Sequence, residues 1–322
     1  MRMLSASLLA VCTLIFPCTL TLADDAKGPK VALKVDKGAT LSYTVKRNAS
    51  SESQFGDNEF STNDETEIAY KIEVADKKDN GDLSLKVTYA TLKTKQSMRD
   101  QTFEFDSAKE AKSDDEIATT LRNTIAKPIT ATFSGGKVTK IEGFPEVQRP
   151  EQGDRGAFRR MQILGNTAGQ RALQRDLDII LCTAIQGQSL EKGKEYKPAP
   201  VAAPEGGGEG RRRGRGFFGG GRETRSILKF EGEDQADGKK VLRFSLAAEP
   251  PAEQGDGPRA EVKTDGSALV SSDDGILSKL EMKSESKTSF ERDGQTSRSH
   301  RKATTTITRS ASAKPADSGV KL

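Results

Sequence analysis

Residues 67–89 read EIAYKIEVADKKDNGDLSLKVTY, and this stretch decides the fold class of the chain. Apolar residues alternate with polar ones on both sides of its central polar segment, at positions Ile68, Tyr70, Ile72, Val74, Leu83, Leu85, Val87 and Tyr89. A period of two places such residues on one face of a β-strand. Asn80-Gly81 supplies the positive backbone angles that a tight hairpin turn favours. The stretch predicts an antiparallel hairpin with one buried face.

The same alternation recurs along the chain in both directions. Upstream it involves Leu41, Tyr43 and Val45, and downstream it continues to the long hairpin expected from Ile276 to Thr308. The second half of the chain repeats the order of the first with unequal spacing, which indicates a degenerate internal duplication. The paired segments are 38–43 with 193–196, 68–89 with 227–246, and 129–141 with 267–280.

Two segments have helical rather than strand periodicity. Ser113 and Glu116 have the spacing of a capping box, and Pro128 ends the first helix. The second helix is expected from Arg171 to Ile185 with Gly187 as its C-cap. Its apolar stripe consists of Leu173, Leu177, Ile180, Leu181 and Ala184, with Arg171, Arg175, Asp176 and Asp178 largely off it. We expect this stripe to pack on the sheet as core; the alternative is that it borders an apolar crevice.

These elements predict a mainly β (α+β) fold with antiparallel curved sheets in two similar halves, each packed against a helix. The expected organisation is a signal peptide over 1–23, a first β-rich half over 24–150, a connecting helical segment over 151–187, a second β-rich half over 188–309 and a flexible tail over 310–322.

The first residues follow the order of a secretory signal peptide. Arg2 precedes an apolar stretch from 8 to 22, and Thr21-Leu22-Ala23 places small residues where signal peptidase cleaves. An uncleaved anchor and lipid attachment at Cys18 are alternatives, disfavoured by the short, interrupted apolar run and by the bulky residues before Cys18. We expect an exported protein, periplasmic or extracellular, with Cys182 as its one mature thiol and no transmembrane span.

Residues 198–222 form a low-complexity insertion rich in arginine and glycine. This composition predicts disorder, because it cannot bury enough apolar area to offset its ordering entropy. Arg211, Arg212, Arg213 and Arg215 are candidate anion contacts, whose partners in an exported protein would be an envelope polymer or lipid head groups. The plainer interpretation is a flexible loop between strands. Nucleic acid is not an expected partner, and the whole chain is nearly charge-balanced, with 51 Lys and Arg against 47 Asp and Glu.

The order of elements resembles a bacterial family of exported β proteins and lipoproteins of unknown function. The resemblance rests on a Gly-x-x-x-x-Tyr opening at 38–43, a hairpin, an acidic segment before a helix, the Phe-x-x-Gly-Lys-Val-x-x-Ile hairpin at 133–141, and a repeated half after a helix. It extends over most of residues 36–309. Because such a family has no established activity, the resemblance implies a compartment and an architecture only.

Residues with catalytic or metal-binding chemistry are scarce. The chain has one histidine, His300, flanked by basic residues, and we expect it on a surface strand rather than in an active site. One histidine and one mature cysteine do not suffice for a zinc site. The turn 76–82 resembles a calcium loop, but Lys78 occupies a ligand position, so we expect a plain turn. We therefore predict no catalytic, cofactor-binding or metal-binding residues.

The function expected from the sequence is a non-catalytic binding or structural component of the cell envelope, with another envelope protein as a further candidate partner. One alternative is a carrier that holds an apolar or lipid-like ligand in a crevice between sheet and helix, where Leu173, Leu177, Ile180 and Leu181 would line the site. The other is a carboxylate-dependent envelope hydrolase without a known motif.

Overall fold

The computed structural model describes residues 28–98, 101–109, 116–144, 165, 167–198, 226–249, 259–292 and 295–310. The predicted signal peptide, the insertion from residue 199 onward, the capping residue Ser113 and the tail after residue 310 lie outside the described residues.

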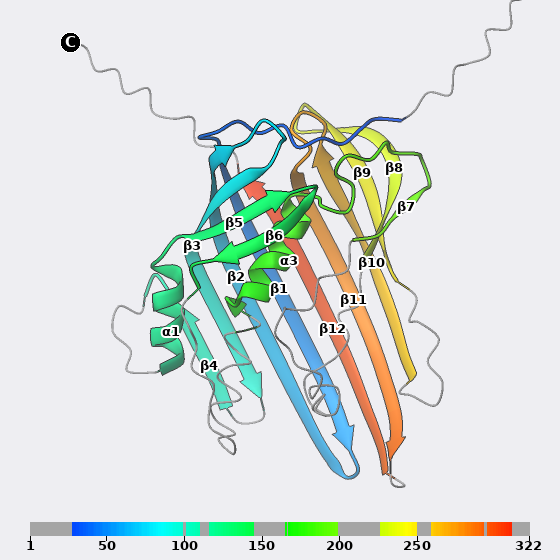
Figure 1. The fold of residues 1–322 in the computed structure, drawn as a ribbon. Coiled ribbons are helices and arrows are strands. Elements are labelled where there is room, and N and C mark those ends of the chain that lie inside the picture. Colours follow the sequence, from blue (N-terminus) through cyan, green and yellow to red (C-terminus); the bar gives the residue numbers. More distant parts are fainter. Residues whose placement is uncertain are drawn as a thin grey trace, which may run out of the picture.

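The described residues form one antiparallel sheet and two helices (Figure 1). The elements are β1 (Thr40–Phe55), β2 (Asn58–Lys77), β3 (Leu83–Met98), β4 (Gln101–Asp106), α1 (Glu116–Ile125), β5 (Ile129–Ser134), β6 (Lys137–Glu142), α3 (Gln170–Ile180), β7 (Glu195–Tyr196), β8 (Ser226–Ala236), β9 (Lys239–Ala248), β10 (Arg259–Ser271), β11 (Leu277–Arg292) and β12 (Gln295–Ser310). The strand order is β6-β5-β3-β2-β1-β12-β11-β10-β9-β8-β7, and β4 pairs with β3 beside this path.

The hairpin predicted from residues 67–89 is confirmed as β2 and β3. The turn between them is closed by the Lys78 amide, which donates to the Asp82 carbonyl oxygen at 2.9 Å, and Gly81 has a φ of +86°. Burial alternates along both strands as the period of two requires. Residues 76–82 thus form a plain hairpin turn, as expected.

The first and last strands join the sheet into a single unit. β1 pairs with β12 from Ser42↔Ser310 to Phe55↔Ser297, so strands of the two predicted halves are neighbours in one sheet. The predicted mainly β, antiparallel class is confirmed, with one continuous sheet of twelve strands in the described part. α1 contacts β3 and α3 contacts β6, so both described helices make their main strand contacts with the first half.

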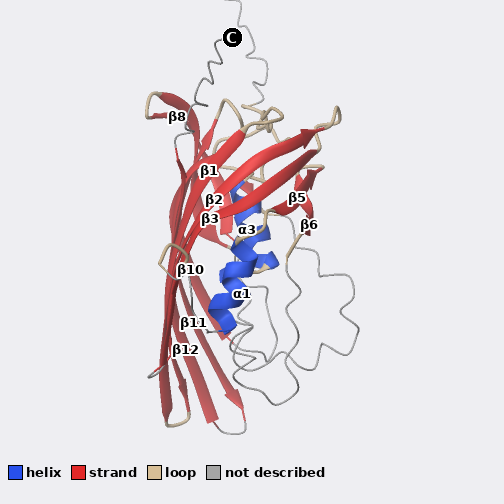
Figure 2. Cartoon of the chain, turned by 90° about the vertical axis from the view of Figure 1, so that its left-hand side faces the viewer, coloured by secondary structure: helices blue, strands red, loops and turns tan. Residues whose placement is uncertain are grey.

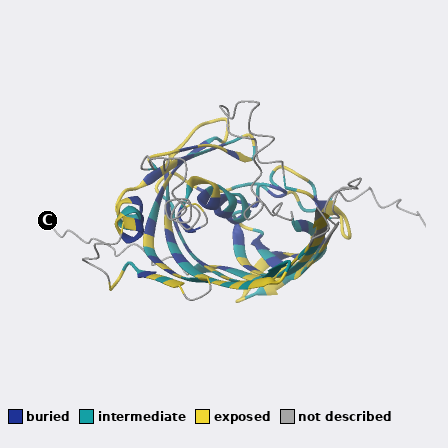
Figure 3. Cartoon of the chain, turned by 90° about the horizontal axis from the view of Figure 1, so that it is seen from below, coloured by how far each residue is buried: buried dark blue, intermediate teal, exposed yellow. Residues whose placement is uncertain are grey.

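The sheet curves around α3. Figure 2 shows both helices on the same side of the long strands, with β5 and β6 beyond α3. In the view along the strands, the sheet encloses a central helix (Figure 3). Neither described helix has the length and apolar content that a membrane-spanning helix requires.

The second predicted helix ends earlier than its apolar stripe suggested. α3 stops at Ile180, and Cys182 takes a positive φ of 52°. The amide of Cys182 donates to the Ile179 carbonyl oxygen and that of Thr183 to the Asp178 carbonyl oxygen, which is a Schellman motif. The C-cap is therefore Leu181, not Gly187. The apolar residues after Ile180 lie in turns, and they are buried in the core without being helical.

One cross-strand row forms the centre of the core. Residues paired in register across eight strands face α3 and are all at most 4% exposed: Leu92, Ile68, Val45, Ile307, Leu280, Ala268, Phe244 and Phe230. The stripe of α3 joins the same hydrophobic cluster. Burial of these apolar side chains is the main driving force that holds the helix within the curved sheet.

Candidate functional site at the inward face of the sheet

The inward face of the sheet changes character one row beyond the apolar core. The next residues in register are Thr94, Thr66, Arg47, Thr305, Met282 and Gly266. Thr94 and Thr66 hydroxyls lie 3.2 Å apart within hydrogen-bond range. The first polar row of the inward face thus lies where α3 still covers the sheet. A buried polar group there needs a hydrogen-bond or ion-pair partner.

Asp176 of α3 meets this polar row. Its side chain is fully buried, and its Oδ1 forms an ion pair with Arg47 of β1. Tyr70 of β2 donates its hydroxyl to Asp176 Oδ2 at 2.8 Å. The sequence placed Asp176 off the buried stripe, and this was wrong. The sheet wraps around α3 and so buries more of the helix than a flat sheet would.

Two tyrosines complete the buried cluster. Burial raises the pKa of Tyr70 to about 12 against the opposing effect of Arg47, and burial raises the pKa of Tyr89 as well. Their ring centroids are 5.1 Å apart. The neighbouring Tyr70 raises the pKa of Tyr89 further. Among the described residues, the buried Tyr89 hydroxyl has no partner within normal hydrogen-bond geometry. Both tyrosines therefore stay protonated at neutral pH.

The cluster is better suited to anchoring α3 than to catalysis. Both carboxylate oxygens of Asp176 already have charged or hydrogen-bonded partners. A general acid or base needs an oxygen within reach of a substrate proton. The buried cluster holds the helix in the curved sheet. Side chains that could contact a ligand must therefore be sought farther along the strands.

Beyond the cluster the strands carry a surface that we call the inward polar face. Most of its side chains are small or polar and have intermediate burial: Ala49, Ser51, Ser53, Thr62, Asp64, Gln96, Thr264, Ser284, Ser286 and Ala303. The same rows also hold Phe60, Met98, Val262 and Arg301. Their neighbours on the other side of the same strands, such as Ser50, Asn63 and Lys283, are exposed. Strands β3, β2, β1, β12, β11 and β10 contribute to this surface.

Charges are few on the inward polar face. Burial raises the pKa of Asp64, and Arg301 opposes this shift. Among the described residues in these rows, Asp64 is the only acid. Gln96 donates to the Thr167 hydroxyl at 3.3 Å, which ties the start of the α3 segment to the edge of the surface.

The outward face of the same strands is charged. Lys46 pairs with Glu67 at 3.3 Å and Lys279 with Glu281 at 2.7 Å. His300 lies on this face of β12, as expected, and its Nε2 is 2.7 Å from Glu285 Oε1, which lowers the pKa of Glu285. The sequence could not show this contact, because the partner comes from the adjacent strand. Alternating charge of this kind is typical of a solvated sheet face.

The predicted site residues have different outcomes. Leu173, Leu177, Ile180 and Leu181 are all at most 1% exposed within the core. Arg211, Arg212, Arg213 and Arg215 lie outside the described residues. Sequence reasoning missed Arg47 and Tyr70 as partners of Asp176. One signal was available for Arg47, because it continues the alternation of Leu41, Tyr43 and Val45 onto the buried face.

Comparison with known proteins gives a family match over part of the chain and no activity. Residues 80–149 match the model of a "Family of unknown function (DUF6263)", in agreement with the predicted resemblance. This region runs from the β2–β3 turn through β6. No curated protein matches the chain.

Among solved structures, the chain is similar to lipovitellin, in a structure titled "Lipid-protein interactions in lipovitellin", with 10% identity and a TM-score of 0.41 over 86% of this chain. It spans about a quarter of that protein, 26% of its chain. OpdQ of Pseudomonas aeruginosa (7% identity, TM-score 0.22, 84% of this chain and 99% of that chain) and the translocator domain of the autotransporter NalP from Neisseria meningitidis (7%, 0.15, 84% and 89%) are more remote. Similarities this low establish no shared function.

Proposed function

We propose that the protein is an exported, non-catalytic binding component of the cell envelope, and that the inward polar face is its binding surface. The signal-peptide pattern of residues 1–23 supports export to the periplasm or the extracellular space. The charged outward face of the strands supports an aqueous setting.

The observation that carries this proposal is the contrast between the two parts of the inward face. Around α3 the sheet is filled by the helix and sealed by the Asp176 cluster. Beyond it, half-buried Ser, Thr and Ala side chains present hydroxyl and methyl groups over five strands, and β3 adds Gln96. Small side chains let a partner approach the backbone closely, and hydroxyls both donate and accept hydrogen bonds.

The two alternatives have less support. A carboxylate hydrolase needs two carboxyl groups that flank the scissile bond, and Asp64 has no second acid beside it in the described rows. A carrier of apolar ligands needs an open apolar surface, whereas the stripe of α3 is packed in the core.

Native mass spectrometry of the protein recovered from envelope fractions tests the proposal. Ser51 faces inward on β1, and its neighbour Ser50 faces outward, so the two provide a matched pair. We expect the wild type and Ser50→Trp to retain a bound molecule or partner and Ser51→Trp to lose it. Retention by Ser51→Trp, or no bound species on any of the three proteins, contradicts the proposal.

A further inference from the structure

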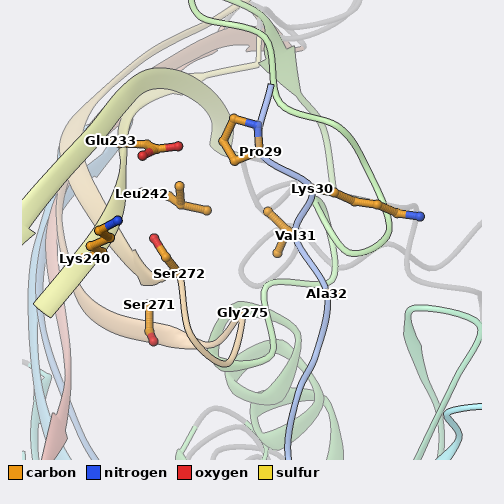
Figure 4. Close-up of a pocket in the computed structure, with 10 residues that line it drawn as sticks. All are labelled: Pro29, Lys30, Val31, Ala32, Glu233, Lys240, Leu242, Ser271, Ser272 and Gly275. Carbon is orange, nitrogen blue, oxygen red and sulfur yellow. The ribbon is translucent and has the colours of Figure 1, made fainter. Parts of the chain in front are cut away.

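A pocket of about 230 Å³ lies far from the inward polar face, where three segments of the chain meet (Figure 4). Residues 29–32 form one wall, the β8–β9 hairpin forms the second and the β10–β11 turn forms the third. The pocket lies below the roughly 300–1,000 Å³ that drug-sized ligands occupy, so it suits a small molecule.

Backbone contacts fix the walls of this pocket. The amide of Lys34 donates to the Asp274 carbonyl oxygen at 3.0 Å, and that of Ser272 donates to the Lys240 carbonyl oxygen at 3.1 Å. Gly275 has a φ of +69°, and a Cβ added there would lie 2.4 Å from the Ala32 carbonyl oxygen. The close approach of residues 29–32 to the turn thus requires glycine, and the pocket is preformed.

The chemistry of the lining combines an apolar floor with opposite charges at the rim. Val31 and Leu242 are buried, whereas Glu233 and Lys240 are exposed. Glu233 is paired in register with Leu242, and Lys240 precedes Leu242 by two residues, so all three share one face of the hairpin. Figure 4 shows Glu233, Leu242 and the Ser272 side chain directed toward the space opposite Pro29 and Val31.

The two charged side chains at the rim have no partner of their own within the described part of the chain. Within the described residues, the side chains of Glu233 and Lys240 form no ion pair and no hydrogen bond, whereas Asp234 and Arg243 on the other face of the same hairpin form an ion pair. An acid and a base that both face a preformed pocket without partners are complementary to a ligand with both charges.

We propose that this pocket binds a small zwitterion with an aliphatic side chain, of which an α-amino acid is the simplest. Lys240 Nζ and the Ser272 hydroxyl bind the carboxylate, Glu233 binds the ammonium group, and Leu242 and Val31 contact the aliphatic side chain. This site is independent of the proposed function at the inward polar face.

Titration of the mature protein with L-leucine, followed by calorimetry and by methyl NMR, tests the proposal. We expect a dissociation constant of about 1 mM or tighter, in line with the size of the ligand. Shift changes should centre on the methyl groups of Leu242 and Val31. N-acetyl-L-leucine, which lacks the ammonium group, and L-leucinamide, which lacks the carboxylate, should each bind at least about tenfold more weakly.

Single substitutions test whether the charges of Glu233 and Lys240 contribute to L-leucine binding. Glu233→Gln and Lys240→Gln should each weaken L-leucine binding about tenfold or more. Asp237→Asn and Lys239→Gln remove the same charges from the turn of this hairpin outside the pocket lining and should leave binding unchanged. All four positions are exposed, and unfolding midpoints verify that each variant folds. Absence of L-leucine binding at about 10 mM, equal binding of the blocked analogues, or shift changes away from Leu242 would overturn the proposal.

Discussion

Arg47 of β1 and Asp176 of α3 form an ion pair at the boundary where the inward face of the sheet changes from apolar to polar. The pair joins residues 129 positions apart in the sequence. Asp176 is fully buried and Arg47 is 17% exposed, so the pair is largely removed from solvent. It fixes the depth at which α3 lies in the sheet, because a shift of the helix along the strands would bring the carboxylate against apolar side chains.

Removal of the buried carboxylate should destabilise the protein strongly. Asp176→Ala leaves the Arg47 guanidinium and the Tyr70 hydroxyl without this acceptor, and breaking a buried ion pair typically lowers the free energy of unfolding by about 3–5 kcal/mol. Denaturant unfolding measures this change. Asp273→Ala, at an exposed position of the β10–β11 turn, is the control and should change it by less than about 0.5 kcal/mol. Equal stabilities of the two variants would show that the pair does not anchor α3.

The stripe of α3 should behave as core. Leu177 and Leu181 are at most 1% exposed, so Leu177→Ala and Leu181→Ala should each lower the free energy of unfolding by about 2–5 kcal/mol. Unfolding midpoints measure this, with binding of 8-anilinonaphthalene-1-sulfonate or a fatty acid as a second readout. Unchanged midpoints together with lost probe binding would instead favour a carrier with an apolar crevice.

Asp178 makes stability depend on pH. Burial raises its pKa to about 6, against hydrogen bonds from the Thr183 side chain and the Val138 backbone. Because the folded state holds this proton more tightly than the unfolded state, the acid favours folding below its unfolded pKa of about 4, and this contribution is lost as pH rises through about 6. Asp178→Asn should therefore raise the unfolding midpoint at pH 7.5 and leave it nearly unchanged at pH 4. A lower midpoint at pH 7.5 would contradict the assigned cause of the shift.

Gly238 and Gly275 have similar backbone angles, so alanine substitutions at the two positions distinguish the stability cost of backbone strain from that of steric conflict. Gly238 has a φ of +73° with open space around it, whereas Gly275 has +69° with the Ala32 carbonyl oxygen in the way. Gly238→Ala should cost about 1–2 kcal/mol of stability through strain alone. Gly275→Ala should cost clearly more, because residues 29–32 must move. Thermal unfolding of both variants decides this, and equal costs would exclude a steric role for Gly275.

The strands could be predicted because their signals are local. The alternation in residues 67–89 determined β2 and β3, and the glycine and asparagine turns determined where the chain reverses. The register could not be read in this way. The pairing of β1 with β12 depends on contacts between residues more than 240 positions apart, such as Ser53 with Ser299. One sheet rather than two follows from that pairing.

The site was less accessible to sequence reasoning than the fold. Asp176 looks like a solvent-facing residue when α3 is considered alone, and only the curvature of the sheet buries it. The inward polar face consists mainly of Ser, Thr and Ala, which carry no distinctive motif. It can be recognised only because strand alternation continues past the apolar core. The predicted signal peptide and nearly all of the low-complexity insertion lie outside the described residues, so both assignments stay predictions.

Thiol labelling along β1 tests the proposed binding surface most directly. Cys182 is buried, and burial raises its pKa, so it should react slowly and leave an introduced cysteine as the reporter. Ser51→Cys reports on the inward polar face, and Ser50→Cys reports on the outward face one residue away. Maleimide labelling of the mature protein is measured with and without envelope extract. We predict that the extract slows labelling of Ser51→Cys several-fold and leaves Ser50→Cys unchanged. Equal rates with and without extract at Ser51→Cys, or protection at Ser50→Cys instead, would contradict the assignment of the inward polar face as the binding surface.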